Sequence, residues 1–384
     1  MTATALPDGA KVLHIGMPKT GTTAVQHALW RAREQLAAHG VHNVSRGPHE
    51  RDVALTAVGS AREHHQPRPE RWAALAADFR TSTARRTVWS SEALSLASAE
   101  RVAHLRAELG PAYVVTTLRA LAPQLASRWQ QGVRRGATVP LDDWLHDRLG
   151  DPGEEPDFER PHVRGDAVRR SDPRRVVHAW GRAFGEDRLV FVVLDPTDRD
   201  ALLRRFEALL GVPRLLEPVP STNASLPWPE AEALRHLARA FHDSGGERRD
   251  WMATIGDPGR TSLQEVVDAA PRSPIPVPRW AAERANEHTA AWVAGLRASG
   301  ATIVGDVAHL FVDAEGRPEE LEPPTRVDVA SAGRLMDACF RAALARPAAS
   351  PARPPDLSAV GGRALVRELG RRAIARGRAS RRSG

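Results

Sequence analysis

The sequence predicts an α/β fold in which a parallel sheet of about four to five strands is flanked by helices, with extra helices toward the C-terminus. Short β-branched, apolar runs alternate with helical stretches along the first half of the 384-residue chain. Two of these runs, 112–118 and 188–194, are apolar almost throughout, which is typical of strands buried on both faces of a parallel sheet. A third observation is a tight Gly/Pro loop that joins the first strand, at Lys11, to a helix beginning near Thr22.

The remaining elements follow from hydrophobic periodicity and from start and stop signals. Ser98 is a plausible cap for one helix, and Gly110 with Pro111 ends it. We expect a further strand at 86–90, and the segments 41–45 and 301–306 are candidates for additional short strands. The helices are expected at 22–39, 53–61, 71–83, 98–109, 123–135, 172–184, 198–210, 228–244, 278–299 and 330–344.

Composition divides the chain into one domain with two flanking segments. We expect a flexible N-terminus over 1–10, a single α/β domain over 11–345, and a Pro/Ala linker with an Arg-rich tail over 346–384. Within the domain, residues 139–166 are acidic and contain Pro and Gly throughout. This stretch predicts an irregular insertion or lid.

The basic character of the chain belongs to its tail. Residues 351–384 hold nine Arg against Asp356 and Glu368, which accounts for the whole net charge of +7. The rest is formally neutral, so we expect no nucleic-acid partner. The tail carries apolar residues at roughly helical spacing, which makes it a candidate for weak contact with an anionic membrane or another polyanion. The alternative is a disordered, soluble tail.

The single cysteine, Cys339, excludes an internal disulfide and a cysteine-based zinc site. No apolar run of 18 residues predicts a transmembrane helix. Residues 1–10 lack a basic stretch followed by an apolar one, so we expect no secretory signal. A cytoplasmic location is the simplest expectation.

The loop between Gly16 and Gly21 enters a helix N-terminus, where free N–H groups and the helix dipole favour a phosphate or sulfate. Its spacing is P-loop-like with one change: Thr22 stands where a lysine normally follows the second glycine, and Lys19 lies inside the loop. The chain has only one other lysine, Lys11, among its 54 basic residues. That bias favours a need for a compact ammonium at Lys19. The alternative is a simple turn with a solvated lysine.

The run His14-Ile-Gly-Met-Pro-Lys-Thr-Gly-Thr-Thr23 resembles the 5′-phosphosulfate loop of sulfotransferases that use 3′-phosphoadenosine 5′-phosphosulfate (PAPS). The resemblance is to bacterial and carbohydrate-modifying members, and it covers roughly residues 10–310. It implies that this loop binds the sulfuryl donor and that no metal is required. Lys19 would then stabilise the departing oxygen. The donor-binding residues implied in the loop are Pro18, Lys19, Thr20, Gly21, Thr22 and Thr23.

A second motif follows the strand 112–118. Arg119 ends that strand, and Ser127 lies one turn into the next helix, on the same face as Gln124 and Gln131. Ligands bind at the carboxyl ends of parallel strands, so Arg119 and the loop suit one molecule with two anionic groups. The Arg119–Ser127 spacing resembles the 3′-phosphate motif of the same family. The alternative is a solvated Arg and a surface Ser.

The acceptor hydroxyl needs a general base. Glu92 follows the strand 86–90, and carbohydrate sulfotransferases commonly place a Glu or His base there, so Glu92 is the first choice. The alternative is an acid that only stabilises the first turn of a helix. His64 and His65 are the next candidates, whereas His14, inside the first strand, is expected to be a core residue. A late segment, 221–225, resembles an Asn-x-Ser element of bacterial sulfotransferases.

Together these patterns predict an enzyme that moves a sulfuryl group from PAPS to a hydroxyl of a carbohydrate or small molecule by in-line displacement. By analogy with phosphoryl transfer, positioning and cations at the leaving oxygen should supply most of the catalysis. Two alternatives remain open: a nucleotide-dependent kinase for a small acceptor, and a non-catalytic nucleotide-binding module.

Overall fold

The computed structural model describes most of the first 344 residues. The chain divides into two compact units, Met1–Ala343 and Leu344–Gly384, and the second lies almost wholly outside the described part. The expected Arg-rich tail, His64 and the segment 221–225 also lie outside it. The described ranges are 4–60, 65–150, 157–158, 166–198, 200–218, 226–256, 263, 265–266 and 274–344.

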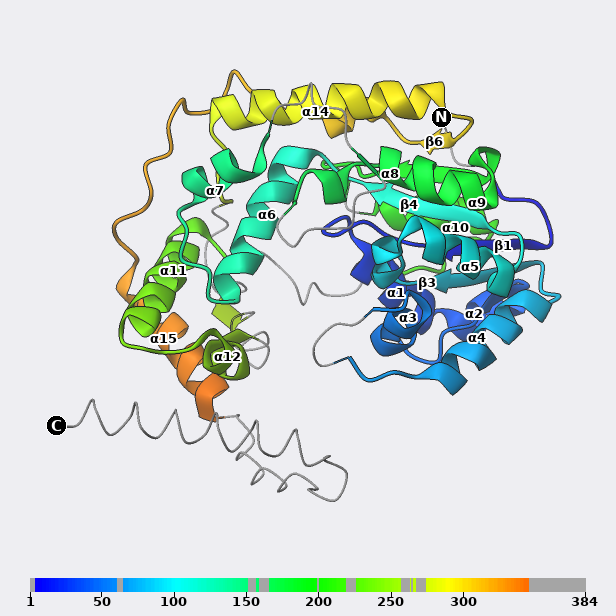
Figure 1. Ribbon diagram of the computed structural model, residues 1–384, viewed down its shortest axis with the longest axis horizontal. Coiled ribbons are helices and arrows are strands. Elements are labelled where there is room, and N and C mark those ends of the chain that lie inside the picture. Colours follow the sequence, from blue (N-terminus) through cyan, green and yellow to red (C-terminus); the bar gives the residue numbers. More distant parts are fainter. Residues whose placement is uncertain are drawn as a thin grey trace, which may run out of the picture. The chain divides into compact units, whose positions relative to one another are not determined.

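One parallel sheet organises the first unit, with the strand order β2-β3-β1-β4-β5-β6 (Figure 1). It has six strands against the expected four to five, because two three-residue strands pair at its edges. Such short segments carry too few residues for a clear sequence pattern. The strands are β1 Ala10–His14, β2 Val41–Asn43, β3 Arg86–Ser90, β4 Tyr113–Leu118, β5 Leu189–Val193 and β6 Thr302–Val304.

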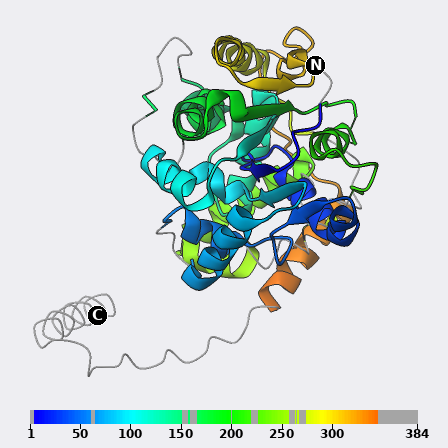
Figure 2. The same cartoon turned by 90° about the vertical axis from the view of Figure 1, so that its right-hand side faces the viewer.

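Helices cover both faces of the sheet, which gives three layers (Figure 2). Alternate strand residues point to opposite faces. Leu13 and Trp89 therefore enter the core beside α3 (Arg51–Ala57), α4 (Pro69–Thr81) and α5 (Ala99–Leu109). Val12 and Val88 enter the core on the other face, beside α1 (Thr22–Arg31), α2 (Arg33–Ala38) and α10 (Ala201–Leu210). This alternation across neighbouring strands in register confirms the α/β class that the apolar runs predict.

The helices lie close to the expected ranges. Ser98 caps α5 as predicted, because its side chain accepts a hydrogen bond from the N–H of Arg101 at 3.2 Å. The longer helices are α1 Thr22–Arg31, α2 Arg33–Ala38, α3 Arg51–Ala57, α4 Pro69–Thr81, α5 Ala99–Leu109, α6 Leu121–Arg134, α7 Leu141–Arg148, α10 Ala201–Leu210, α11 Trp228–Asp243, α14 Arg279–Ala298 and α15 Val329–Leu344. The shorter turns are η1 Glu92–Leu96, η2 Arg169–Ser171, α8 Arg174–Val176, η3 Val177–Gly181, α9 Arg182–Phe184, η4 Glu186–Arg188, α12 Arg248–Trp251, η5 Met252–Gly256 and η6 Val307–Leu310.

Three segments differ from the sequence-based expectation. The helix after β4 begins at Leu121, two residues before the start that Pro123 predicts. Helix α7 lies inside the stretch 139–166 that predicted irregular structure, since a Leu-Asp-Asp-Trp-Leu run supplies an apolar face that the many acids obscure. The expected helix 172–184 is interrupted by the π-helical turn η3.

The N-terminal segment that was expected to be flexible is held to the body at Leu6. This side chain is buried, and its N–H donates to the carbonyl of Leu209 at 3.0 Å. Its own carbonyl accepts from the buried guanidinium of Arg86 at 2.8 Å. An apolar side chain and a buried Arg thus attach residue 6 to the domain, while the flexibility of 1–10 stays a prediction.

A second group of helices builds a core of its own beside the sheet. Helices α6, α7 and α11 lie together in Figure 1, and α14 packs on α6. Trp129 of α6 and Trp251 of α12 fill the middle of this core. Helix α6 therefore begins at the carboxyl end of β4 and packs along the rest of its length within the helical group. It connects the carboxyl ends of the strands to this second region.

Strand order also identifies where a ligand site belongs. Strand β1 lies between β3 and β4, and the chain leaves β1 toward β2 but leaves β3 toward β4, on the other side. Ligands of open α/β sheets bind beyond the carboxyl ends of strands at such a reversal. The loops after β1, β3 and β4 meet there, and they carry Lys19, Glu92 and Arg119. Within the described residues, no helix combines the length and apolar content needed to cross a bilayer.

Candidate functional site

The loop between β1 and α1 has an unusual backbone. Gly16 and Gly21 have φ angles of 46° and 86°, and Lys19 has a φ of 68°. Among the described residues, Lys19 is the only non-glycine residue with a positive φ. This conformation costs free energy for a residue with a side chain, so it persists where the surroundings hold it.

Three consecutive loop residues are held by the segment that leaves β4. The buried Gln124 of α6 donates through Nε2 to the carbonyl of Pro18. Arg119 donates through Nη1 to the carbonyl of Lys19 at 3.4 Å. The hydroxyl of Thr20 lies 2.6 Å from that of Thr117 and donates to the carbonyl of Met17 at 2.6 Å. The two motifs found in the sequence are therefore in direct contact.

The start of α1 offers groups that suit an anion. Gly21 is the N-cap, and the first N–H groups that bond back to its carbonyl are those of Ala24 and Val25, at 3.0 and 3.2 Å. The preceding N–H groups belong to the turn that helices leave without intrahelical acceptors. The Thr22 hydroxyl is buried and has no hydrogen-bond partner. Thr23, the next residue of α1, is half-buried.

Gly16 leaves room for that hydroxyl. A Cβ on Gly16 would lie 2.1 Å from Thr22 Oγ1, so only glycine fits. An orphaned buried hydroxyl, a glycine cradle and a helix N-terminus together fit a bound phosphate or sulfate oxygen.

The pKa of Lys19 is lowered from 10.5 to about 8, chiefly by burial. The positive charges of Arg134, Arg135 and Arg128 contribute to this lowering, whereas the negative charge of Glu92 opposes it. An ammonium in this position is poised to gain from a nearby anion, because an anion compensates both its desolvation and the repulsion by the guanidinium groups.

Arg119 comes directly after β4 and is largely buried, which lowers the pKa of its guanidinium. Arg119 follows the strand that pairs with β1. A single ligand with two anionic groups requires a second cation in such a position. Ser127 is half-buried on α6, one turn after Gln124. The structure thus brings Pro18, Lys19, Thr20 and Arg119 together, while a contact of Ser127 with Arg119 stays a prediction.

Glu92 is the first residue of η1, directly after β3. The turn that carries it is fixed by the N–H of Ser91, which donates to the carbonyl of His14 at 2.9 Å. Gln26 of α1 also donates to the carbonyl of Ser90 at 2.9 Å. The Glu92 side chain is exposed, and its charge acts on Lys19, so the expected base and the loop lysine lie within electrostatic reach of each other.

Sequence reasoning missed a set of largely buried arginines, two of which lie within electrostatic reach of Glu92. Chiefly because of burial, the pKa values of Arg128 and Arg170 are lowered, that of Arg128 to about 10, and the charge of Glu92 opposes both shifts. Arg175 is held at a pKa of about 10, chiefly by burial. A signal existed, because Arg128 shares its helix face with Gln124, four residues earlier. It was overlooked because arginine is so common in this chain.

His65 and His14 both make contacts within the fold that hold their rings in place. The ring of His65 contacts the carbonyls of Ser60 and Asp52 at 3.0 and 3.2 Å and the hydroxyl of Thr56 at 3.1 Å, so it bridges the two ends of α3. Its role as a base stays a prediction. His14 is fully buried as expected: its Nδ1 lies 2.8 Å from Ser90 Oγ, and burial lowers its pKa to about 3.

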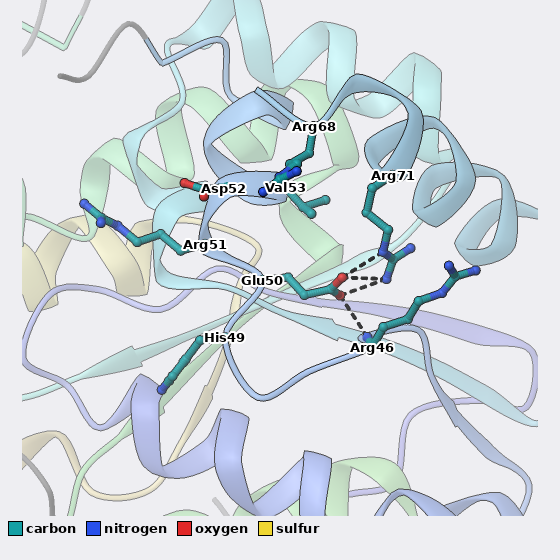
Figure 3. Close-up of a pocket in the computed structure, with 8 residues that line it drawn as sticks. All are labelled: Arg46, His49, Glu50, Arg51, Asp52, Val53, Arg68 and Arg71. Carbon is teal, nitrogen blue, oxygen red and sulfur yellow. Dashed lines mark hydrogen bonds and ion pairs between the residues drawn. The ribbon is translucent and has the colours of Figure 1, made fainter. Parts of the chain in front are cut away.

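A polar pocket of about 510 Å³ lies in the loop after β2 and the start of α3 (Figure 3). Glu50 forms its wall and accepts from Arg71 Nε at 2.8 Å and from the N–H of Arg46 at 2.9 Å. His49 points away toward α1, where Nε2 lies 2.8 Å from His27 Nε2. None of the lining residues is a predicted site residue, so this pocket is separate from the loop that holds Lys19.

Within the part of the chain that the structure describes, no three or more His, Cys, Asp or Glu side chains are grouped as metal ligands. Comparison with protein-family models, with curated proteins and with solved structures found no match to this chain. The contacts around Lys19, Arg119 and Glu92 are therefore what supports a function.

Proposed function

We propose that this chain is a PAPS-dependent sulfotransferase with a P-loop-like nucleotide site, acting on a hydroxyl of a carbohydrate or small molecule. The observation that supports it most is the direct bonding of Pro18, Lys19 and Thr20 to Gln124, Arg119 and Thr117. The sequence offers two separate anion motifs, and this bonding makes them neighbours on strands β1 and β4. A molecule with two separated anionic groups, such as PAPS, matches that pair.

The 5′-phosphosulfate would lie against the N-terminus of α1. The backbone N–H groups of Thr20 to Thr23 and the unpartnered hydroxyl of Thr22 would donate to its oxygens. The 3′-phosphate would bind Arg119, whose planar guanidinium suits a phosphate bidentately, with Ser127 as a further hydrogen-bond donor.

The transfer is a single in-line displacement. The acceptor oxygen forms a bond to sulfur while the bond between sulfur and the bridging oxygen breaks. The electron pair of the broken bond stays on the 5′-phosphate of the departing 3′-phosphoadenosine 5′-phosphate (PAP). The acceptor proton passes to the carboxylate of Glu92. Lys19 donates a hydrogen bond to the bridging oxygen, where negative charge grows.

The surroundings of Lys19 and Glu92 support these roles. A lysine whose pKa lies near 8 before any anion arrives regains its full charge when the donor binds, because the anion favours the ammonium form. Glu92 lies within electrostatic reach of Lys19 and Arg128, so the proposed base and the proposed leaving-group cation are close to each other.

Calorimetric titration with PAP and, separately, with ATP and Mg²⁺ tests the proposal. We expect PAP to bind and ATP–Mg²⁺ to bind far more weakly, since Thr22 replaces the lysine that follows the second glycine of nucleoside-triphosphate loops. Tight binding of ATP–Mg²⁺ without binding of PAP would favour the kinase alternative. Radiolabelled-sulfate transfer from PAPS to a panel of sugars, phenols and alcohols separates an enzyme from a non-catalytic binding module.

A further inference from the structure

Arg128 and Arg170 come from distant parts of the chain and meet beside the candidate site. Arg128 of α6 donates through Nη2 to the hydroxyl of Ser171 at 3.0 Å, and Arg170 is the neighbour of Ser171 in η2. Ser171 is itself buried and donates to the carbonyl of Ala167 at 2.8 Å. These bonds tie Arg128 to the turn that carries Arg170, and the charge of Arg170 lowers the pKa of Arg128, so the two guanidinium groups lie within electrostatic reach of each other.

Both guanidinium groups are mostly buried, and no carboxylate of the described residues pairs with either of them. Within the described residues, neither Arg128 nor Arg170 forms an ion pair with a carboxylate, and Arg128 Nε is buried without a hydrogen-bond partner. The carboxylate of Asp166 accepts from the N–H of Arg169 at 2.9 Å, and that of Asp172 is paired with Arg174 at 2.7 Å.

Removing cations from water without pairing them costs free energy, which a bound anion can offset. The carboxylates of Glu92 and Asp166 act electrostatically on both arginines, and Glu92 also acts on Lys19. An anion held by Arg128 and Arg170 would therefore lie next to the carboxylate that takes the acceptor proton.

We propose that Arg128 and Arg170 form an oxyanion subsite that holds a carboxylate, sulfate ester or phosphate ester group of the acceptor. This inference rests on the proposed function, because Glu92 is taken there as the neighbour of the acceptor hydroxyl. The preferred acceptor is then an anionic sugar or small molecule. Two planar forks bind one oxyanion bidentately, which orients the acceptor as well as attracting it.

The first test locates the anion directly. Crystals of the full chain grown with PAP are soaked in sodium selenate, whose selenium scatters X-rays anomalously. We expect an anomalous peak between the guanidinium groups of Arg128 and Arg170 and its loss in Arg170→Gln. The proposal is overturned by no peak there, by an equal peak in Arg170→Gln (an adventitious ion only), or by a PAP phosphate or a carboxylate of this chain lying between the two groups.

The second test compares two acceptors that differ in one group, 4-nitrophenyl β-D-glucuronide and 4-nitrophenyl β-D-glucoside. We expect kcat/KM to favour the glucuronide about tenfold or more, as a charge-assisted contact supplies. In Arg170→Gln the ratio should fall to about one, whereas Arg239→Gln, an exposed site on α11, should keep it. If neither compound accepts sulfate, calorimetric affinities for the PAP-saturated protein supply the ratio, and a ratio near one in wild type overturns the proposal.

The two tests separate this inference from the proposed function. If PAP does not bind but selenate still lies between Arg128 and Arg170, the subsite stands and the sulfotransferase proposal fails. If PAP binds and transfer occurs with equal preference for both compounds, the proposed function stands and the subsite fails.

Discussion

The loop after β1 and the Arg128–Arg170 pair are two cationic regions near Glu92, built in opposite ways. The loop is a continuous run whose proposed anion-binding groups are mainly backbone N–H groups, with one lysine held at a φ of 68°. The arginine pair uses side chains only, from two segments joined through Ser171. A backbone site fixes one geometry for a constant ligand. A side-chain site can be altered one residue at a time, which suits a variable acceptor.

Removing the Lys19 ammonium tests the role assigned to the loop and should have the largest effect. Lys19→Met should lower turnover by about 10²–10³-fold, because it deletes the cation at the leaving oxygen. Lys11→Met is the matched control, since it changes the only other lysine, which contacts the carbonyl of Arg80. Steady-state transfer rates decide the matter. Equal losses in both variants would remove Lys19 from the mechanism.

Removing the carboxylate between the two regions should have the next largest effect. Glu92→Gln is expected to slow transfer by about 10²-fold through loss of the base. PAP affinity should stay the same or rise, because a negative charge near Lys19 disappears. His65→Gln, measured beside it, serves as the comparison. A large loss there with little change in Glu92→Gln would assign proton transfer to His65.

The backbone nature of the loop is tested at Gly16. Gly16→Ala places a Cβ against Thr22 Oγ1 and should lower the free energy of unfolding by about 1–3 kcal/mol, together with PAP affinity. Gly59→Ala has a similar positive φ of 64° but open space around its Cβ. Chemical denaturation and calorimetry of both variants isolate the clash. Comparable PAP affinity in the two variants would show that the loop tolerates a displaced Thr22.

The smallest expected effect is a pH dependence of PAP binding. The protonated form of Lys19 binds the anion, so affinity should fall as pH rises through about 8, by roughly tenfold per pH unit above it. The phosphates, with a second pKa near 6, do not titrate there. Calorimetry between pH 7 and pH 9 measures the slope, which should vanish in Lys19→Met. A slope that persists in that variant would belong to another group.

The same pKa has a consequence for stability of the ligand-free protein. The unfolded chain keeps the Lys19 proton up to about pH 10.4, whereas the folded chain releases it near 8. The unfolded state thus binds more protons in this window, so the contribution of Lys19 to stability rises with pH from about 8 to about 10.

The sequence predicted what depends on local pattern. Strands β4 and β5 were clear because they are apolar on both faces, and the loop was clear because its residues are contiguous. The three-residue strands β2 and β6 were only weakly indicated, since pairing with a neighbour defines them. Helix α7 was masked by its acids, although Leu141 and Leu145 bury one face.

The Arg128–Arg170 pair could not be predicted, because the position of Arg128 on the helix face of Gln124 does not identify a partner and only the fold brings α6 to η2. The bonding of Pro18 to Gln124 was likewise hidden. Helical spacing predicts that Gln124 and Ser127 share a face, but it does not predict which residues that face contacts.

Helix α6 also fixes the distance between the two regions. Gln124 grips the carbonyl of Pro18, and Arg128 stands one turn further on the same face, about 6 Å along the axis. The distance between the loop at Pro18 and the proposed acceptor subsite at Arg128 is therefore set by the geometry of one helical turn. One residue inserted between these positions would rotate the guanidinium by about 100° about the helix axis and remove this fixed separation. With the helix intact, the proposed site would select acceptors by the distance between their hydroxyl and their charged group as well as by the charge itself.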